Sequence, residues 1–350
     1  MARLMASCRA RCAAVVALVW LVGIAGVLPG PWATVAKADL PNYQLVGTFA
    51  LPAGTASYDL LPDGRAMAIV GESIWTQSAV NSSAFGVAGS VPAGTVASFG
   101  ASFLRISPSG TRVAVGDNDF GPGAQVFVFD PGTLSTAAPV AGATYQVDNY
   151  DAHWSSDHTL YVSGGNFTDT LVTRLDASLG AHAPVITGIA GASGGITTDG
   201  TYLYTANGFA FGGPSAMGDV KAFALASLTP GTPVNFETQG TLVARVLSGN
   251  TLGFDHLGNL LVGGGPGGFA AVVDGDEVQN ALVGGPMATT RLELSPTTQD
   301  SHFIRHNPAT GELLVTTFGD STVHRYAVVP APGAWILLGS MALPGRRRRA

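Results

Sequence analysis

The chain has 350 residues with 17 Lys and Arg, 23 Asp and Glu and a formal net charge of −6. Eight of the basic residues lie before Asp39 or in Arg346–Arg349, so residues 39–345 carry 9 basic and 23 acidic side chains, a balance of −14. A segment this acidic repels phosphate backbones, which disfavours nucleic-acid binding. Both cysteines, Cys8 and Cys12, lie near the N-terminus. Beyond them the sequence therefore excludes disulfides, thiolate metal sites and a cysteine nucleophile.

Residues 1–38 have the pattern of a secretory signal peptide. Three arginines open the segment, and Ala13–Val27 is an apolar run without charge. Small residues then follow at Ala36 and Ala38, in the A-x-A arrangement that signal peptidase requires. An uncleaved anchor is the alternative, but the run is shorter than the roughly 20 apolar residues of a bilayer span. We expect export, with signal peptidase cleaving after Ala38.

Residues 39–329 contain a repeated strand–turn–strand unit. The first expected strand is Tyr43–Leu51, and its ending, LPAGT, is nearly repeated forty residues later as VPAGT. Turn residues mark six copies: Gly64, Gly110, Asp157, Gly200, Gly258 and Gly311. Each is followed by a β-rich segment, AMAIV, RVAVG, LYVSG, YLYTA, LLVGG or LLVTT. Repeats of roughly 40–50 residues with four short strands are typical of propeller blades.

This pattern predicts an all-β protein built as a single β-propeller. No segment shows a convincing 3.6-residue apolar period, so no long helix is expected. The last repeat, His302–Val329, supplies only three strands, and Tyr43–Leu51 is the missing fourth. Pairing them would remove an exposed sheet edge. We therefore expect six blades with the N-terminal strand closing the last. Seven blades is the alternative, because the step of 58 residues from Gly200 to Gly258 could hide extra structure.

The strand–turn–strand units over residues 43–329 resemble the YVTN-like propeller repeats of bacterial surface proteins. The matching features are SPDG-like turns followed by LYV-like strands. The resemblance implies the fold and not the function, because propellers include enzymes, lectins and scaffolds.

Residues 330–350 resemble a PEP-CTERM sorting signal of Gram-negative bacteria. The matching features are a Pro-x-Pro start, a short apolar core with an aromatic residue, and a terminal basic cluster: Pro330, Pro332, Trp335, Arg346, Arg347, Arg348 and Arg349. Ala331 stands where the family usually has Glu, and the core is short. The resemblance implies transient membrane contact, processing by exosortase-type machinery, and a place at the cell surface or in the extracellular matrix. A disordered basic tail is the alternative.

Polar residues near the starts of the inner strands predict a ligand-binding mouth on one side of the channel. The inner-strand candidates are Asp59, Ser102, Asp151, His153, Ser193, Asp255, Asp300 and His302. The loops expected on the same side add Asp117, Asp119 and Phe120. Oxygen ligands favour calcium, and the two histidines favour a transition metal. Because Asp is also a common turn residue, ordinary turns are the favoured explanation of these positions.

Two classes of function therefore stay open. The first is a non-catalytic binding or scaffold module of the cell surface, whose partner is an exopolysaccharide or other glycan, or a surface protein. The second is a metal-dependent hydrolase of the lactonase or esterase type, with calcium or another divalent cation at the channel mouth. Because the sequence shows no G-x-S-x-G elbow between a strand and a helix, no H-E-x-x-H helix and no Walker loop, we favour the non-catalytic class.

Overall fold

The computed structural model describes residues 40–92, 96, 101–117, 124–136, 141–144, 148–165, 169–191, 194–207, 217–247, 249–265, 269–294 and 302–329. The expected signal peptide and sorting tail, together with Asp119, Phe120, Ser193 and Asp300, lie outside these residues. In the described part of the chain, no helix is long and apolar enough to cross a membrane.

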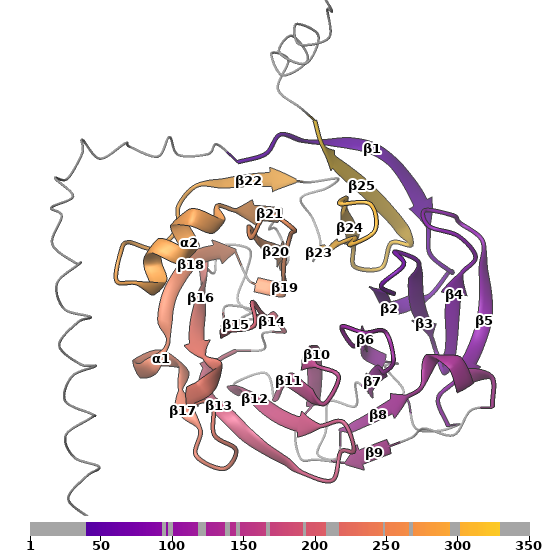
Figure 1. Cartoon of the computed structure of the whole chain (residues 1–350), viewed down its shortest axis with the longest axis horizontal. Helices are drawn as coiled ribbons and strands as arrows, with labels where there is room; N and C mark the ends of the chain where they lie inside the picture. The colour runs from indigo at the N-terminus through magenta and orange to yellow at the C-terminus, as the bar shows by residue number, and fades with distance from the viewer. Residues whose placement is uncertain are drawn as a thin grey trace, which may run out of the picture. The chain divides into compact units, whose positions relative to one another are not determined.

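The structure is a six-bladed β-propeller, as the repeats predict (Figure 1). The strands of blades 1 to 3 are β2 (Thr55–Leu60), β3 (Ala66–Val70), β4 (Ser73–Gln77), β5 (Phe85–Ser90); β6 (Ala101–Ile106), β7 (Val113–Asp117), β8 (Gln125–Phe129), β9 (Ala141–Thr144); β10 (Asp148–Ser156), β11 (Thr159–Gly165), β12 (Asp169–Asp176), β13 (His182–Ala190).

Blades 4 to 6 repeat this order, with one strand taken from the start of the chain. Their strands are β14 (Ile196–Thr198), β15 (Tyr202–Ala206), β16 (Met217–Ala224), β18 (Thr241–Leu247); β19 (Gly249–Phe254), β20 (Leu260–Gly264), β21 (Ala270–Val273), β22 (Arg291–Leu294); β23 (His302–His306), β24 (Leu313–Thr317), β25 (Thr322–Val328), β1 (Tyr43–Ala50). The first strand of each blade lies nearest the centre of the ring in Figure 1.

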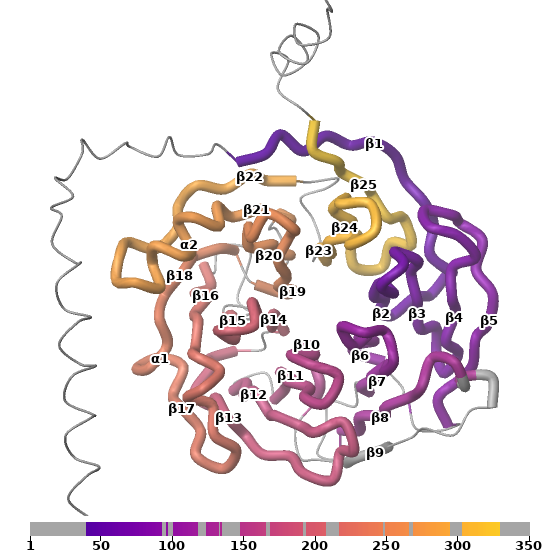
Figure 2. Tube along the Cα trace, in the orientation of Figure 1, coloured from indigo at the N-terminus to yellow at the C-terminus, as the bar shows by residue number. Residues whose placement is uncertain are grey.

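The N-terminal strand closes the ring, as predicted. β1 pairs antiparallel with β25, from Tyr43 opposite Val328 to Ala50 opposite Thr322. In Figure 2 these strands, indigo and yellow, lie side by side. Blade 6 therefore contains both ends of the propeller, and β25 is not left as an open sheet edge.

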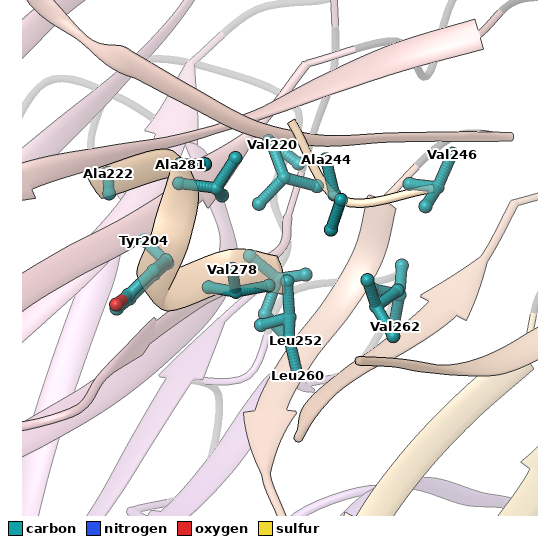
Figure 3. Packing of buried hydrophobic residues seen from close by; sticks show 14 residues of the cluster. Tyr204, Val220, Ala222, Ala244, Val246, Leu252, Leu260, Val262, Val278 and Ala281 are labelled. Atoms are coloured by element: carbon teal, nitrogen blue, oxygen red, sulfur yellow. The ribbon is translucent and has the colours of Figure 1, made fainter. Parts of the chain in front are cut away.

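The second strand of every blade is buried on both faces because each sheet lies between two neighbours. Strands β7, β20 and β24 are buried along their whole length. This explains why the corresponding segments are nearly continuous apolar runs instead of alternating ones. Six clusters of buried side chains fill the six seams between neighbouring blades. Figure 3 shows the cluster between blades 4 and 5, where Tyr204 and Val220 meet Leu252 and Val262.

The turns that join the first and second strands lie on one side of the propeller, which we call the turn face. Gly64, Gly110, Gly200, Gly258 and Gly311 all adopt positive φ there, between 72° and 89°. A side chain at Gly64 would also collide with Ala309 of blade 6, whose Cβ would lie 2.6 Å away. The opposite side, where second strands turn into third strands and each blade leads to the next, is the loop face.

The long step from Gly200 to Gly258 holds extra structure but not a seventh blade. It contains the 3-10 helix η2 (Leu225–Ser227), the short strand β17 (Val234–Asn235) and the helix α1 (Phe236–Gln239). β17 pairs in parallel with β13, so this connection from blade 4 adds a fifth strand to blade 3. A second 3-10 helix, η1 (Pro131–Thr136), lies in the corresponding connection of blade 2.

The longer of the two described α-helices was not predicted from the sequence. α2 (Gly275–Leu282) begins at Asp274, whose Oδ1 accepts a hydrogen bond of 3.0 Å from the Glu277 amide. This is the N-cap arrangement, which satisfies an otherwise unpaired amide of the first turn. Val278 and Ala281 face the seam between blades 4 and 5 (Figure 3). With eight residues, the helix is too short to show a clear period in the sequence.

Candidate functional site

One equivalent position on each inner strand defines the centre of the propeller. On each inner strand it is the residue of the last pair but one that the strand forms in regular register with the second strand before the turn. Examples are the pairs Asp59–Met67 in blade 1 and Arg105–Ala114 in blade 2. The six residues are Asp59, Arg105, His153, Thr197, Gly253 and Arg305, and we call them the axial positions. Two arginines, one aspartate and one histidine thus share a single level of the channel.

Arg105 is the most deeply held of these side chains, with 7% of its surface exposed. Its Nε donates to the Ala152 carbonyl of blade 3 at 3.1 Å. One terminal nitrogen donates to the Leu104 carbonyl at 2.6 Å and to Ser57 Oγ of blade 1 at 3.2 Å. The other forms an ion pair with Asp151 of blade 3. A single guanidinium thus connects three blades.

Asp151 is the buried counterion of Arg105. Its Oδ1 also accepts a hydrogen bond of 2.7 Å from the Ala152 amide, whereas its Oδ2 is buried and has no hydrogen-bond partner among the described residues. Burial raises the pKa of Asp151, while the charges of Arg105 and Arg305 oppose that rise. Burial likewise lowers the pKa of Arg105, and the neighbouring Arg305 lowers it further. Each group is therefore tolerated in its charged form because the other is present.

Arg305 carries positive charge across the channel. It comes from blade 6, and its Nε lies 3.8 Å from Asp59 Oδ1 of blade 1, while Asp59 Oδ2 accepts 2.8 Å from the Ile106 amide of blade 2. Its charge also reaches His153 of blade 3, on the opposite side of the ring (Figure 1). Burial, followed by repulsion from Arg305 and Arg105, lowers the pKa of His153 to about 3. The imidazole is therefore neutral at physiological pH.

The sequence-predicted site residues do not gather at one mouth. Asp59, Asp151 and His153 do meet in the channel. The structure corrects the predicted place of Asp255. This residue lies in the blade 5 turn on the turn face, where its Oδ1 accepts hydrogen bonds from the Leu257 and Asn259 amides at 2.9 and 2.8 Å. The backbone bond from the Asp255 amide to the Asn259 carbonyl matches that from Leu61 to Arg65. Asp255 thus lies two residues beyond the axial position of its strand.

The remaining predicted residues that the structure describes, Ser102, Asp117 and His302, lie near the loop face. Asp117 ends β7, and its Oδ1 accepts from the Gln125 amide at 2.7 Å and from Asn149 Nδ2 at 3.3 Å. Ser102 Oγ donates to the Asp117 carbonyl at 3.0 Å and to the Asn149 carbonyl at 2.6 Å. The backbone of His302 begins β23, opposite Thr317. The contacts of Ser102 and Asp117 with Asn149 join blades 2 and 3.

The sequence interpretation missed both axial arginines. They occupy the same place in two similar segments, FLRISP at 103–108 and FIRHNP at 303–308. Comparing equivalent positions across the repeats would have found them.

The channel does not fit the expected divalent cation. Among the described residues, no group of three or more His, Cys, Asp or Glu side chains is placed to hold a metal. The two carboxylates that contact the axial arginines, Asp59 and Asp151, are directed at those arginines and at backbone amides. A cation would have to sit beside two guanidinium groups, which repel it. The arrangement is that of a structural ion-pair cluster.

We expect Arg105→Met to lower the free energy of unfolding by about 3–5 kcal/mol, because it leaves the Asp151 carboxylate buried and unpaired. The matched control is Arg65→Met. Arg65 pairs with Asp63 at 2.8 Å on the surface, where both side chains are more than one-third exposed. That change should cost at most about 1 kcal/mol. Urea unfolding of the two variants measures the difference, and equal losses would contradict the structural role of Arg105.

His153 should make the protein sensitive to mild acid. The unfolded histidine takes up a proton near its ordinary pKa of 6.5, whereas the folded one does so only at about 3. The free energy of unfolding should therefore fall as the pH drops from about 6.5, by at most about 1.4 kcal/mol per pH unit. Urea unfolding between about pH 5 and 7 should show a smaller slope for His153→Gln than for wild type. His158→Gln, at an exposed turn, is the control, and parallel slopes for wild type and His153→Gln would contradict the assignment.

Comparison with known proteins supports the fold. No protein-family model and no curated protein matches the sequence. A chain of the crystal structure of a mitotic checkpoint complex is similar in fold, with 11% sequence identity, a TM-score of 0.53, and coverage of 84% of this chain and 98% of that one.

Two enzyme structures are similar at a lower level. A luciferin-regenerating enzyme has 14% identity and a TM-score of 0.48, with coverage of 83% and 96%. An oligogalacturonate lyase in complex with manganese has 11% identity and a TM-score of 0.47, with coverage of 79% and 77%. Propellers serve as binding scaffolds and as enzymes, so the shared fold does not choose between the two classes.

Proposed function

We propose that this protein is an exported, non-catalytic propeller that binds a glycan or another protein at the cell surface. The observation that carries the proposal is the set of polar contacts inside the channel. Its two carboxylates are directed at arginines and backbone amides, so the polar centre acts as a cross-brace between blades. A rigid ring of this kind presents its loops in fixed positions, which lowers the entropy lost on binding.

An exposed aromatic side chain on the loop face supports a binding role. Phe318, between β24 and β25, is 68% exposed. Its ring centroid lies 6.4 Å from that of Phe303, at an interplanar angle of 42°. An aromatic ring held beside a second one can stack on the apolar face of a sugar or on a partner's side chain. Because residues 39–345 carry a balance of −14, we expect neutral or basic ligands rather than acidic ones.

The ends of the sequence supply the cellular part of the proposal. The YVTN-like repeats, the signal peptide of residues 1–38 and the PEP-CTERM-like tail of residues 330–350 together suggest export from a Gram-negative cell. Signal peptidase and an exosortase-type enzyme would process the two ends. Exopolysaccharide or a surface protein would then be the ligand.

The intact mass of the exported protein tests this part. Expression in a Gram-negative host should yield a product that begins at Asp39, and Ala38→Phe should block the cleavage because the peptidase requires a small residue there. A host with an exosortase should also shorten the C-terminus, and replacing Arg346–Arg349 by Ala should prevent that. An exported product that still begins at Met1 would contradict the assignment of the signal.

Binding is tested with the mature protein on an array of bacterial surface glycans and, for a protein ligand, with purified surface proteins. We expect Phe318→Ala to weaken binding at least tenfold because it removes the stacking ring. Leu257→Ala is the control, since Leu257 is 54% exposed on the turn face and away from the loop face. If no ligand is retained, or if both variants bind like wild type, the loop face is not the binding surface.

A further inference from the structure

A pair of histidines joins blades 5 and 6 on the turn face, away from the channel. His256 follows Asp255 in the blade 5 turn, and His306 ends β23 of blade 6. His256 Nδ1 lies 3.2 Å from His306 Nε2, although the two ring centroids are 5.1 Å apart. The rings therefore approach each other through their nitrogen-bearing edges. His256 is exposed and His306 is partly exposed, so solvent reaches the pair.

Both histidines are mounted on rigid turns. Beside His256, the Asp255 carboxylate accepts the two backbone bonds of its turn, a bond of 2.9 Å from Asn259 Nδ2 and one of 2.8 Å from the Tyr43 hydroxyl. Beside His306, Asn307 Nδ2 donates to the Gly64 carbonyl at 3.1 Å. Because the backbone on both sides is fixed, the separation of the two imidazoles is set by the fold.

We propose that His256 and His306 form a binding site for a divalent transition-metal cation such as Cu²⁺ or Zn²⁺. Two imidazole nitrogens that share one tetrahedral zinc at 2.0–2.1 Å lie about 3.3 Å apart. The observed 3.2 Å matches this separation, so a metal needs only a small tilt of the rings to replace the hydrogen bond. Imidazole ligands suit copper, zinc and nickel, and they do not suit calcium or magnesium.

The surroundings leave room for the cation and favour it. Position 311 is glycine, and even a Cβ there would lie 4.0 Å from His256 Nδ1 and 3.7 Å from Cε1. The Asp255 carboxylate contributes negative potential, but its four hydrogen bonds keep it from acting as a ligand. Among the described residues the site has two protein ligands, and water completes it.

Copper titration of the mature, tag-free protein tests the proposal. Calorimetry should show one site for Cu²⁺ per chain, and the electron paramagnetic resonance spectrum should show coupling to two imidazole nitrogens. His256→Ala and His306→Ala should each lower the affinity at least tenfold and leave at most one coupled nitrogen. His158→Ala, at an exposed turn of blade 3, is the matched control and should bind like wild type.

Thermal melting gives a second readout. Zn²⁺ should raise the melting temperature of wild type and of His158→Ala by several degrees, because it joins two blades in the folded state only. It should not raise that of His256→Ala. His256 is exposed, so this variant keeps the packed core and gives an answer even if His306→Ala fails to fold. Equal Cu²⁺ affinity in wild type and His256→Ala would overturn the proposal.

Discussion

Closure of the ring is the constraint on which the rest of the structure depends. Each blade is a four-stranded sheet, and its middle strands are buried only because a neighbouring sheet covers each face. Among the described residues no blade has a core of its own, since every apolar cluster is shared between two blades. Pairing of β1 with β25 completes the last blade and thereby supports all six seams.

The polar centre follows from the same geometry. The inner strands lie at the edge of their sheets, so one side of each carries amides and carbonyls that no strand pairs. Side chains take over this role: Asp59 accepts from the Ile106 amide, Thr251 from the Ile304 amide, and Arg105 donates to the Ala152 carbonyl. The charged residues of the channel are thus explained as substitutes for missing strand partners, and their contacts pass from one blade to the next.

The sequence was sufficient for the fold because the fold is repetitive. Turn glycines recur at regular steps, and three strands in the last repeat require a fourth from elsewhere. The site was harder to predict. Asp255 was expected where its inner strand begins, but it lies three residues before Gly258, as Leu61 lies before Gly64, and therefore belongs to the turn that follows the inner strand. Arg105 and Arg305 are far apart in sequence, and only the closed ring brings their charges together. α2 and β17 are too short for their patterns to stand out.

In blades 1 to 5, the connection between the third and fourth strands contacts the preceding blade of the ring. Ser83 of blade 1 bonds to β1 of blade 6, Leu134 of blade 2 packs against β5, and Leu179 of blade 3 lies in the seam with blade 2. Similarly, β17 pairs with β13, and the Ala288 amide donates to the Val243 carbonyl of β18. In blade 6 the third and fourth strands are β25 and β1, which lie at opposite ends of the described chain. No connection between them can therefore contact blade 5. Tyr43–Asp255 and His256–His306 hold this seam instead. Under mechanical load, the ring should part first between blades 5 and 6.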